Sequence, residues 1–527
     1  MGEVLQNSFA FSVTLLRRIE TRSETRHEKL EMASPFDIII VGAGPTGLFS
    51  AVLARQLGLS VCILEKRSGP LPVGRADALN ARTQQVLDVA GVLKDLRPHG
   101  LQCNTSSIFK DGAFQSRNSH WWTSIQHSAY KEFLMIGQPA IEKALVKNLD
   151  IEVLYNTEVL SVTESHYEAT VRTKEKTYTS QYVIGADGGQ SLIRHQLNYK
   201  FEGEKPNMCW AVLDTFIKTD FPVCDEIVSF EENGQSRVSW IPRERDMARF
   251  YILLDGEVTQ ERAEASIRSH MKPFAVEFER TEWFSTYNVQ ERVAQSYISP
   301  LTRILLAGDA SHIHAVNGGQ GLNTGVADAF ALIWRLNFII RGPFSQGKAL
   351  GNVLRSYDSE RRVTAKRVVD VAGMLVRSTL RTAEEYVGLV ERNAANITGM
   401  GITYSADSLA VLAGTVGDFV AGTRCPDIEV VKAGVVKLRL YEVLKYGDFV
   451  VLKGKGADFT APAWAAARTK VWDLEKWENG WRLTTERGMK LFTTVGVGEG
   501  MAVVVRPDLY VGYAGDSPNT YFEGFLA

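Results

Sequence analysis

The order of hydrophobic and polar residues predicts a βαβ unit near the start of the chain. Residues 36–41 (FDIIIV) form a continuous apolar run that ends in a glycine cluster. Residues 48–58 (LFSAVLARQLG) then carry apolar side chains at helical spacing, and residues 61–65 (VCILE) begin as a second apolar run. Short apolar runs are typical of buried strands, and a repeat of three to four residues is typical of amphipathic helices. We therefore expect a strand, a tight turn, a helix and a second strand.

The rest of the chain alternates between sheet and helix patterns in long blocks. Short β-branched runs within residues 151–184 and 209–255 predict sheets, and residues 319–395 predict helices with charged faces. After residue 405 strand patterns return, with a helix-like segment at 460–472 (TAPAWAAARTKVW). This succession predicts an α/β chain with several folding units.

Residues 1–34 do not share this pattern. FAFSVTLL (9–16) resembles a short signal core, but no small-x-small cleavage site follows it, and the segment contains more acidic residues than transit peptides carry. We interpret the segment as a disordered or weakly helical extension. An upstream start codon is the alternative, because Met32 directly precedes the structured pattern.

Composition and charge narrow the class of protein. At about 150 residues per domain, a chain of 527 residues contains three or four folding units. The formal charge of -2 gives no electrostatic reason to expect nucleic acid or an anionic membrane, and no apolar run reaches the ~18 residues of a membrane span. Five cysteines without a CxxC pair argue against a disulfide scaffold or a zinc site and indicate a reducing, cytoplasmic compartment.

The glycine cluster after the first strand has the spacing GxGxxG, at Gly42, Gly44 and Gly47. The first glycine allows a tight turn, the second lets the backbone approach a pyrophosphate, and the third lets helix and strand pack closely. Glu65 ends the next strand, 18 residues past Gly47, where it can accept hydrogen bonds from ribose hydroxyls. The strand, helix and acid together predict a dinucleotide site, which by itself does not distinguish FAD from NAD.

Two further motifs place a carboxylate at the end of an apolar run. The first is YVIGADG (182–188), which in isolation is also typical of a plain strand ending in an Asp-Gly turn. The second is ILLAGDA (304–310), followed by HIHAVNGGQGLNTG (312–325), a glycine-rich turn that opens a helix. Such a turn presents backbone N–H groups and the positive end of a helix dipole, which suit a phosphate or an electron-rich ring edge.

Together these motifs resemble the fingerprint, DG and GD motifs of the class A, single-component flavoprotein aromatic hydroxylases. Within that family the chain is most similar to the phenol 2-monooxygenase branch, a resemblance that extends over residues 35–515 and includes GRAD (74–77) and YNVQER (287–292). Members of this group modify fungal polyketides and alkaloids, so the resemblance implies a fungal biosynthetic enzyme.

The resemblance implies an α/β fold with three parts. A Rossmann-like FAD-binding domain of the glutathione-reductase type is expected in residues 35–200 and 285–395, with an inserted β-sheet substrate domain in residues 201–284. Residues 405–527 resemble a thioredoxin-like domain, which without CxxC has no redox role and is expected to support packing or dimer formation. A homodimer is usual for the branch.

The resemblance also implies the cofactors. One fingerprint indicates one permanently held dinucleotide, which in this family is FAD, whereas NADPH or NADH binds transiently. A metal is not expected, because the pair His312 and His314 has no further ligand cluster near it in the sequence. FAD contacts are expected at Gly42, Gly44, Gly47, Glu65, Lys66, Arg75, Gln138 and Asp187, at Asp309 for the ribityl chain, and at Gly319, Gly321, Leu322 and Asn323 for the flavin ring.

The implied reaction is hydroxylation of a phenolic or related aromatic substrate by NAD(P)H and O2, through a flavin C4a-hydroperoxide. A phenol reacts faster as phenolate, so a group near its oxygen must take the proton. The matching positions are Tyr287, expected to polarise the phenolic oxygen, and Asp77, expected to tune it. The structural alternatives are a core tyrosine with a satisfied hydroxyl and a turn or helix-cap carboxylate.

Two features of the sequence leave questions open. Val316 stands where the family usually has a proline, which removes a fixed φ angle close to the flavin. The aromatic residues His120, Trp121, Trp122 and Phe133 predict either a pocket for a large planar substrate or ordinary core.

Three other functions were weighed against hydroxylation. A flavin halogenase is suggested by Trp240-Ile241-Pro242, although the first tryptophan of that group's WxWxIP motif is replaced by Val238. An epoxidase would use the same cofactor. A non-catalytic carrier with a dinucleotide fold would need no flavin, but the intact DG and GD motifs argue against it.

Overall fold

The first sheet is built around the predicted βαβ unit. Strands β1 (Phe36–Val41) and β2 (Val61–Leu64) are parallel, with Ile38 opposite Val61, and helix α2 (Pro45–Gln56) connects them. The strand order is β8-β2-β1-β11-β10-β9, and β19 pairs with β11 in parallel. The remaining strands of this sheet are β8 (Val153–Leu154), β9 (Val159–Glu164), β10 (Ala169–Thr173), β11 (Thr177–Gly185) and β19 (Ile304–Leu306).

This computed structural model describes only part of the chain, and the expectation for residues 1–34 lies outside the described residues. Contacts join the chain from Asp37 onward into one unit. The described residues are 36–119, 121–122, 125–222, 225–342, 348–405, 408, 411–412, 414–432, 436–476, 490–493 and 497–524.

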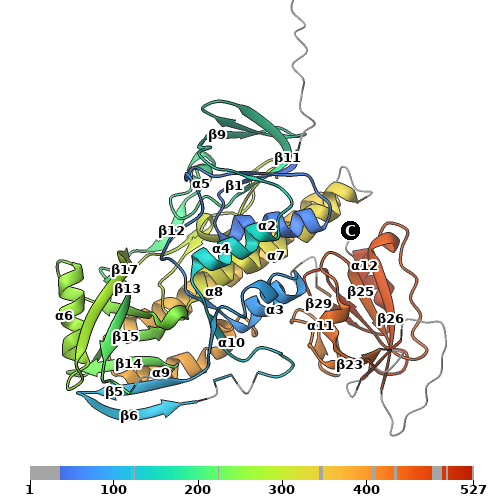
Figure 1. Cartoon of the computed structure of the whole chain (residues 1–527). Helices are drawn as coiled ribbons and strands as arrows, with labels where there is room; N and C mark the ends of the chain where they lie inside the picture. Colours follow the sequence, from blue (N-terminus) through green and yellow to red (C-terminus); the bar gives the residue numbers. More distant parts are fainter. Residues whose placement is uncertain are drawn as a thin grey trace, which may run out of the picture. The chain divides into compact units, whose positions relative to one another are not determined.

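Helices cover the first sheet where the sequence predicts them. Helix α7 (Gln320–Arg341) packs along α2, and α4 (Gln138–Lys147) also contacts α2 (Figure 1). Helix α8 (Lys348–Ser378) packs on α7, and α9 (Ala383–Arg392) follows it, which confirms the helical prediction for residues 319–395. Most of α7 is buried, as its almost continuous apolar sequence requires.

A second sheet has the strand order β17-β13-β16-β15-β14-β5-β6, and most of its strands are labelled in Figure 1. Its core contains Phe230, Trp240 and Phe250, and helix α6 (Gln260–His270) packs against it. Strands β5 and β6 lie outside the residues 201–284 expected for this sheet. The strands are β5 (Ser106–Lys110), β6 (Ala113–Asn118), β13 (Cys209–Thr219), β14 (Ile227–Glu232), β15 (Gln235–Pro242), β16 (Ala248–Leu253) and β17 (Val276–Asn288).

A third sheet occupies the C-terminal part, in the order β24-β23-β27-β26-β25-β28-β29. Strand β25 pairs in parallel with β26 and antiparallel with β28. Helix α12 (Pro518–Gly524) packs on β28 and β29. The strands are β23 (Glu429–Lys432), β24 (Val436–Arg439), β25 (Phe449–Lys453), β26 (Thr469–Lys476), β27 (Lys490–Thr493), β28 (Ala502–Val505) and β29 (Val511–Gly515).

The helix-like prediction for residues 460–472 is wrong. The alanine-rich stretch forms only a 3-10 turn over Ala466–Arg468, and strand β26 begins directly after it. Trp472 and Leu474 point into the core at alternate positions, and β26 pairs with both β25 and β27. Long-range pairing therefore overrides the local helix propensity of the alanines.

Buried charges join the C-terminal part to the helices of the first sheet. The Glu360 carboxylate on α8 accepts hydrogen bonds from Arg335 on α7 at 2.7 Å and from Arg506 beyond β28 at 2.8 Å. Burial alone would raise the pKa of Glu360, but the charges of Arg506 and Arg335 outweigh it and lower the pKa to about 2. In the part of the chain that the structure describes, no helix is long and apolar enough to cross a bilayer.

Candidate cofactor and substrate site

The three sequence motifs meet at one edge of the first sheet. Gly42 follows β1, Asp187 follows β11 and Asp309 follows β19. The backbone N–H of Ala186 donates to the carbonyl of Val41 at 2.9 Å, which holds the ends of β1 and β11 together. Ligands of open α/β sheets bind at the carboxyl ends of the strands, so this edge is the candidate site.

Of the three glycines in the first turn, only Gly44 borders open space, and it is the glycine that lets the backbone approach a pyrophosphate. A Cβ atom on Gly42 would lie 2.3 Å from the carbonyl oxygen of Ala186, and one on Gly47 would lie 2.0 Å from the carbonyl oxygen of Gly42. A Cβ on Gly44 would meet nothing within 4 Å. Helix α2 begins at this open space without a side-chain cap or an acidic residue in its first turn. The turn therefore fits a phosphate group at the positive end of the helix dipole.

Glu65 lies beside this turn at the end of β2. Its carboxylate accepts the backbone N–H groups of Ala43 at 2.7 Å and of Arg67 at 2.8 Å. Burial alone would raise the pKa of Glu65, but these N–H groups and the charge of Arg67 lower it. The group stays ionised and keeps lone pairs for ribose hydroxyls. Lys66 beside it is exposed.

The two aspartates of the DG and GD motifs lie next to the carboxyl ends of β11 and β19. Asp187 Oδ2 accepts the N–H of Ile193 at 3.2 Å, whereas its buried Oδ1 has no partner among the described residues. Asp309 is exposed although Gly308 and Ala310 beside it are buried. Desolvation by the surrounding protein raises the pKa of Asp187 and of Asp309. Two such carboxylates, facing the space beside the glycine turn, fit a ligand that offers hydroxyl groups.

Arg75 and Gln138 lie on the same side of the sheet. Arg75 is exposed with φ 70, and its charge counteracts the raised pKa of Asp309, so the two groups are near one another. The Gln138 side chain accepts from the N–H of Ala76 at 3.3 Å and donates to Glu142 at 2.9 Å. Gln138 therefore holds the loop that carries Arg75.

The second glycine turn begins α7 and touches the first one. Gly319 has the left-handed φ of 60 at the helix N-cap. A Cβ on Gly325 would lie 2.2 Å from the Thr46 hydroxyl oxygen, so α2 and α7 can approach only because residue 325 is a glycine. Gly321 and Leu322 in the first turn of α7 are half-buried.

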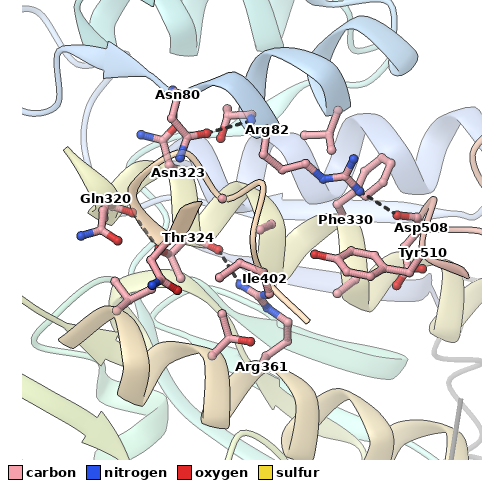
Figure 2. Close-up of a pocket in the computed structure, with 18 of the residues that line it drawn as sticks. Asn80, Arg82, Gln320, Asn323, Thr324, Phe330, Arg361, Ile402, Asp508 and Tyr510 are labelled. Atoms are coloured by element: carbon pink, nitrogen blue, oxygen red, sulfur yellow. Dashed lines mark hydrogen bonds between the residues drawn. The ribbon is translucent and has the colours of Figure 1, made fainter. Parts of the chain in front are cut away.

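Asn323 uses its side chain to fasten this turn to the loop before α3 (Ala81–Val89), as Figure 2 illustrates. Its Oδ1 accepts the N–H of Asn80 at 3.0 Å, and its Nδ2 donates to the carbonyl of Ala78 at 3.0 Å. The Asn323 side chain thus binds protein backbone. The backbone N–H groups at the start of α7 remain available to the ring of a ligand.

Figure 2 also shows a small cavity behind this turn, which has a volume of about 50 Å³. Arg82 on α3 crosses it and donates to the carbonyl of Asp508 at 3.2 Å and to the hydroxyl of Tyr441 at 3.0 Å. The buried amide of Gln320 faces the same cavity without a partner among the described residues. A space of this size, with the Arg82 guanidinium and the Gln320 amide on its wall, fits ordered water molecules.

A large cavity of about 390 Å³ opens next to the second glycine turn. Val316, Gly318 and Gly319 form one part of its wall, and the aromatic residues Trp121, Trp122, Phe133 and Tyr386 form another. The Trp122 and Phe133 rings pack edge to face, with 4.6 Å between their centroids. Trp121, Trp122 and Phe133 line the cavity and also pack in a core cluster. His120 lies outside the described residues.

Asp77 lies on the cavity wall in a buried charged group. Its Oδ2 is 3.3 Å from Arg249 Nη1 and accepts a hydrogen bond from the Tyr251 hydroxyl at 3.3 Å. Arg249 is also paired with the buried Asp214 carboxylate by two hydrogen bonds of 2.6 Å. The paired arginine and the tyrosine hydroxyl fix the position of the Asp77 carboxylate at the cavity surface. Sequence reasoning missed Arg249 and Tyr251, because nothing in an alternating strand marks which side chains face a cavity.

Tyr287 lies on β17 and is not among the described residues that line the cavity. Its hydroxyl donates to the carbonyl of His314 at 2.5 Å. Burial raises the pKa of Tyr287, and the charge of Asp309 raises it further. The hydroxyl thus connects β17 to the segment that leads into the second glycine turn.

The His312 and His314 side chains are used inside the protein. His312 Nε2 is 2.7 Å from Asp328 Oδ2, and the other oxygen of this carboxylate, Oδ1, pairs with Arg361 Nε at 2.7 Å. Burial lowers the pKa of His314 to about 4, and its Nδ1 contacts the carbonyl of Ala315 at 2.8 Å. Within the described ranges, no three His, Cys, Asp or Glu side chains gather as a metal ion would need.

The chain matches two family models that together cover most of its length. The FAD binding domain family matches residues 35–372, and the aromatic-ring hydroxylase C-terminal family matches residues 419–525. A phenol 2-monooxygenase of Aspergillus fumigatus is 30% identical over 77% of this chain and 73% of its own. An FAD-dependent monooxygenase of Aspergillus terreus is 32% identical over 65% of this chain, but this match spans only 52% of that relative.

The fold is also shared with solved structures. Aklavinone-11 hydroxylase, in a ternary complex with FAD and aklavinone, superposes with a TM-score of 0.75 at 22% identity, over 94% of this chain and 99% of that one. A glycine turn with open space, the unpartnered Oδ1 atom of Asp187 and the family match over residues 35–372 agree with one another. The chain belongs to the FAD-dependent aromatic-ring hydroxylases.

Proposed function

We propose that this protein is an FAD-dependent monooxygenase that hydroxylates a phenolic or related aromatic substrate in secondary metabolism. The aromatic compound, O2, NAD(P)H and a proton would give the hydroxylated product, water and NAD(P)⁺. The observation that carries the proposal is the junction of two sites: the glycine turn at Gly319, on the cofactor side, is part of the wall of the cavity that holds Asp77. Among the alternatives weighed above, the family matches favour hydroxylation over halogenation, epoxidation or a carrier role.

FAD would lie along the carboxyl edge of the first sheet. Gly44 and the start of α2 would hold its pyrophosphate, Glu65 its ribose, and Asp309 its ribityl chain. When bound, FAD supplies the redox chemistry, in which electrons from NAD(P)H prepare O2 to give one oxygen atom to an aromatic ring. The surrounding residues bind the cofactor, exclude water and position the substrate.

Asp77 would accept the proton from the phenolic hydroxyl, because its carboxylate faces the cavity and is held by Arg249 and Tyr251. Removing that proton raises the electron density of the aromatic ring. Tyr287 would polarise the same oxygen only after its hydroxyl leaves the carbonyl of His314. Without that movement it would act by positioning the segment that leads to Gly318 and Gly319.

We further propose the domain arrangement that the resemblance implies: an FAD-binding domain in residues 35–200 and 285–395, a substrate domain in 201–284 and a thioredoxin-like domain in 405–527. Strands β5 and β6, although they lie within residues 35–200, complete the sheet of the substrate domain. The protein would work in the cytoplasm as a homodimer. Its described cysteines Cys62, Cys103, Cys209 and Cys425 are free, which supports a reducing compartment.

Isotope labelling tests the function directly. The purified protein should be yellow, and with NADPH, a candidate phenol and ¹⁸O2 it should form a product with one labelled oxygen. A product without label would contradict the monooxygenase, and a colourless folded protein would favour the carrier.

A further inference from the structure

The charge of the large cavity restricts what it can bind. Asp77 and Glu391 are acidic, and none of the described residues on its wall is a lysine, arginine or histidine. The guanidinium of Arg249 lies behind Asp77, where Asp214 also neutralises it. Among the described residues, an aromatic carboxylate would find no cation on the wall to bind its charge, which is unfavourable in a largely apolar site.

The two acids mark the inner and outer parts of the cavity. Asp77 is buried, near the second glycine turn, whereas Glu391 on α9 is exposed and accepts a hydrogen bond from the Asn118 side chain. A ligand passing from the surface to Asp77 would therefore meet a negative charge at both points.

A row of hydroxyl groups crosses the sheet that forms another side of the cavity. Ser229 lies opposite Ser239, and Ser239 lies opposite Tyr251, on neighbouring strands β14, β15 and β16. All three line the cavity, and the hydroxyls of Ser229 and Ser239 have no hydrogen-bond partner in the described part of the chain. Each hydroxyl can donate to or accept from an uncharged oxygen substituent.

The cavity is larger than a single ring requires, and its wall at Gly318 and Gly319 also borders the place proposed for the flavin ring. A cavity of about 150 Å³ is large enough to hold benzene, and this one has about 390 Å³. Trp121, Trp122 and Tyr386 offer ring faces and edges to a flat ligand.

We propose that the cavity selects uncharged, fused-ring phenols with a second oxygen substituent, and that Glu391 and the Ser229–Ser239 row discriminate against aromatic carboxylates and single-ring phenols. This inference rests on the proposed function for the orientation of the substrate, but it concerns binding alone. Glu391 and Ser239 are specificity residues here.

Binding measurements with matched ligands test this inference. The FAD-loaded enzyme, without NAD(P)H, is titrated by calorimetry with 2,6-dihydroxynaphthalene, 6-hydroxy-2-naphthoate and phenol. We expect the diol to bind at least about tenfold more tightly than either of the others. Equal dissociation constants for diol and naphthoate, or for diol and phenol, would overturn the proposal, as would an absence of binding by all three.

Variants separate the contributions of charge and hydroxyl groups. Glu391→Gln should bind the naphthoate about threefold more tightly and leave the diol unchanged, whereas Glu384→Gln, an exposed acid on the same helix outside the cavity wall, should change neither. Ser239→Ala should weaken the diol about fivefold and leave phenol less affected. If the ratios of the ligands' dissociation constants stay unchanged in both Glu391→Gln and Ser239→Ala, Glu391 and Ser239 are not specificity residues.

Labelling keeps this result distinct from the proposed function. If the diol binds selectively but gains no labelled oxygen, the substrate class stands and the monooxygenase proposal fails. If labelled products form from all three ligands without selective binding, the function stands and this inference fails.

Discussion

The hydroxyl of Tyr251 lies 3.3 Å from the Asp77 carboxylate, although 174 residues separate them in the chain. Strand β16 brings the tyrosine to the cavity, and the loop before α3 brings the aspartate. Burial raises the pKa of Tyr251, and the charge of Asp77 raises it further, so the tyrosine remains a hydrogen-bond donor at neutral pH. The pair therefore combines a proton acceptor with a fixed donor.

Replacing Asp77 by Asn should lower the rate of hydroxylation by about a hundredfold, because loss of a positioned base typically costs at least that much. Tyr251→Phe should cost about tenfold, since it removes a hydrogen bond and leaves the carboxylate. Steady-state product formation with phenols of different acidity measures both effects. More acidic phenols should lose less activity in Asp77→Asn, and equal losses for all phenols would contradict a role in proton removal. Tyr167→Phe, at an exposed site, is the control.

Tyr287→Phe removes the hydroxyl that donates to the His314 carbonyl. We expect hydroxylation to slow much more than flavin is lost, because the residue acts on the substrate or on the turn beside it. Product formation and flavin retention after dialysis are measured on the same sample. Unchanged turnover would show that Tyr287 is an ordinary core tyrosine.

Gly44→Ala tests where the phosphate lies. Its Cβ would meet no protein atom within 4 Å, so the melting temperature of the cofactor-free protein should not change. FAD content should fall at least about tenfold at limiting FAD, because the methyl group would occupy the space at the start of α2. The ratio of flavin to protein absorbance measures this loss. Gly69→Ala, whose Cβ also meets nothing, should keep its FAD, and normal flavin content in Gly44→Ala would contradict the assigned position.

Glu360→Gln should destabilise the protein and make its stability depend less on pH. The pKa of Glu360 is lowered from 4.5 to about 2 in the folded chain, so its ionised form stabilises the fold above pH 4.5. That stabilisation, on the order of 3 kcal/mol, is lost as the pH falls from the unfolded value through the folded one. Thermal unfolding of wild type and variant between neutral pH and pH 3 measures the difference, which should be largest at neutral pH. A difference that grows toward low pH would contradict the sign, and Glu384→Gln serves as the exposed control.

The sequence by itself determined the cofactor side of the site. The apolar run at 36–41 and the glycines at 42, 44 and 47 predict β1, the turn and α2, and the structure has them at those positions. Such features are readable because they depend on local requirements: strand and helix periods, and turns where a Cβ cannot fit. The positions of Asp187 and Asp309 were also predictable, because each follows the end of a strand that the sequence indicates.

Only the tertiary structure decided the substrate side. It placed Tyr251 and Ser239 on the cavity wall, brought strands β5 and β6 into the second sheet, and made residues 469–476 a strand. These outcomes depend on pairing between segments far apart in the chain, which no local period encodes. Which face of a strand borders a cavity is likewise set by its neighbours, so the chemistry of substrate selection could be read only after folding.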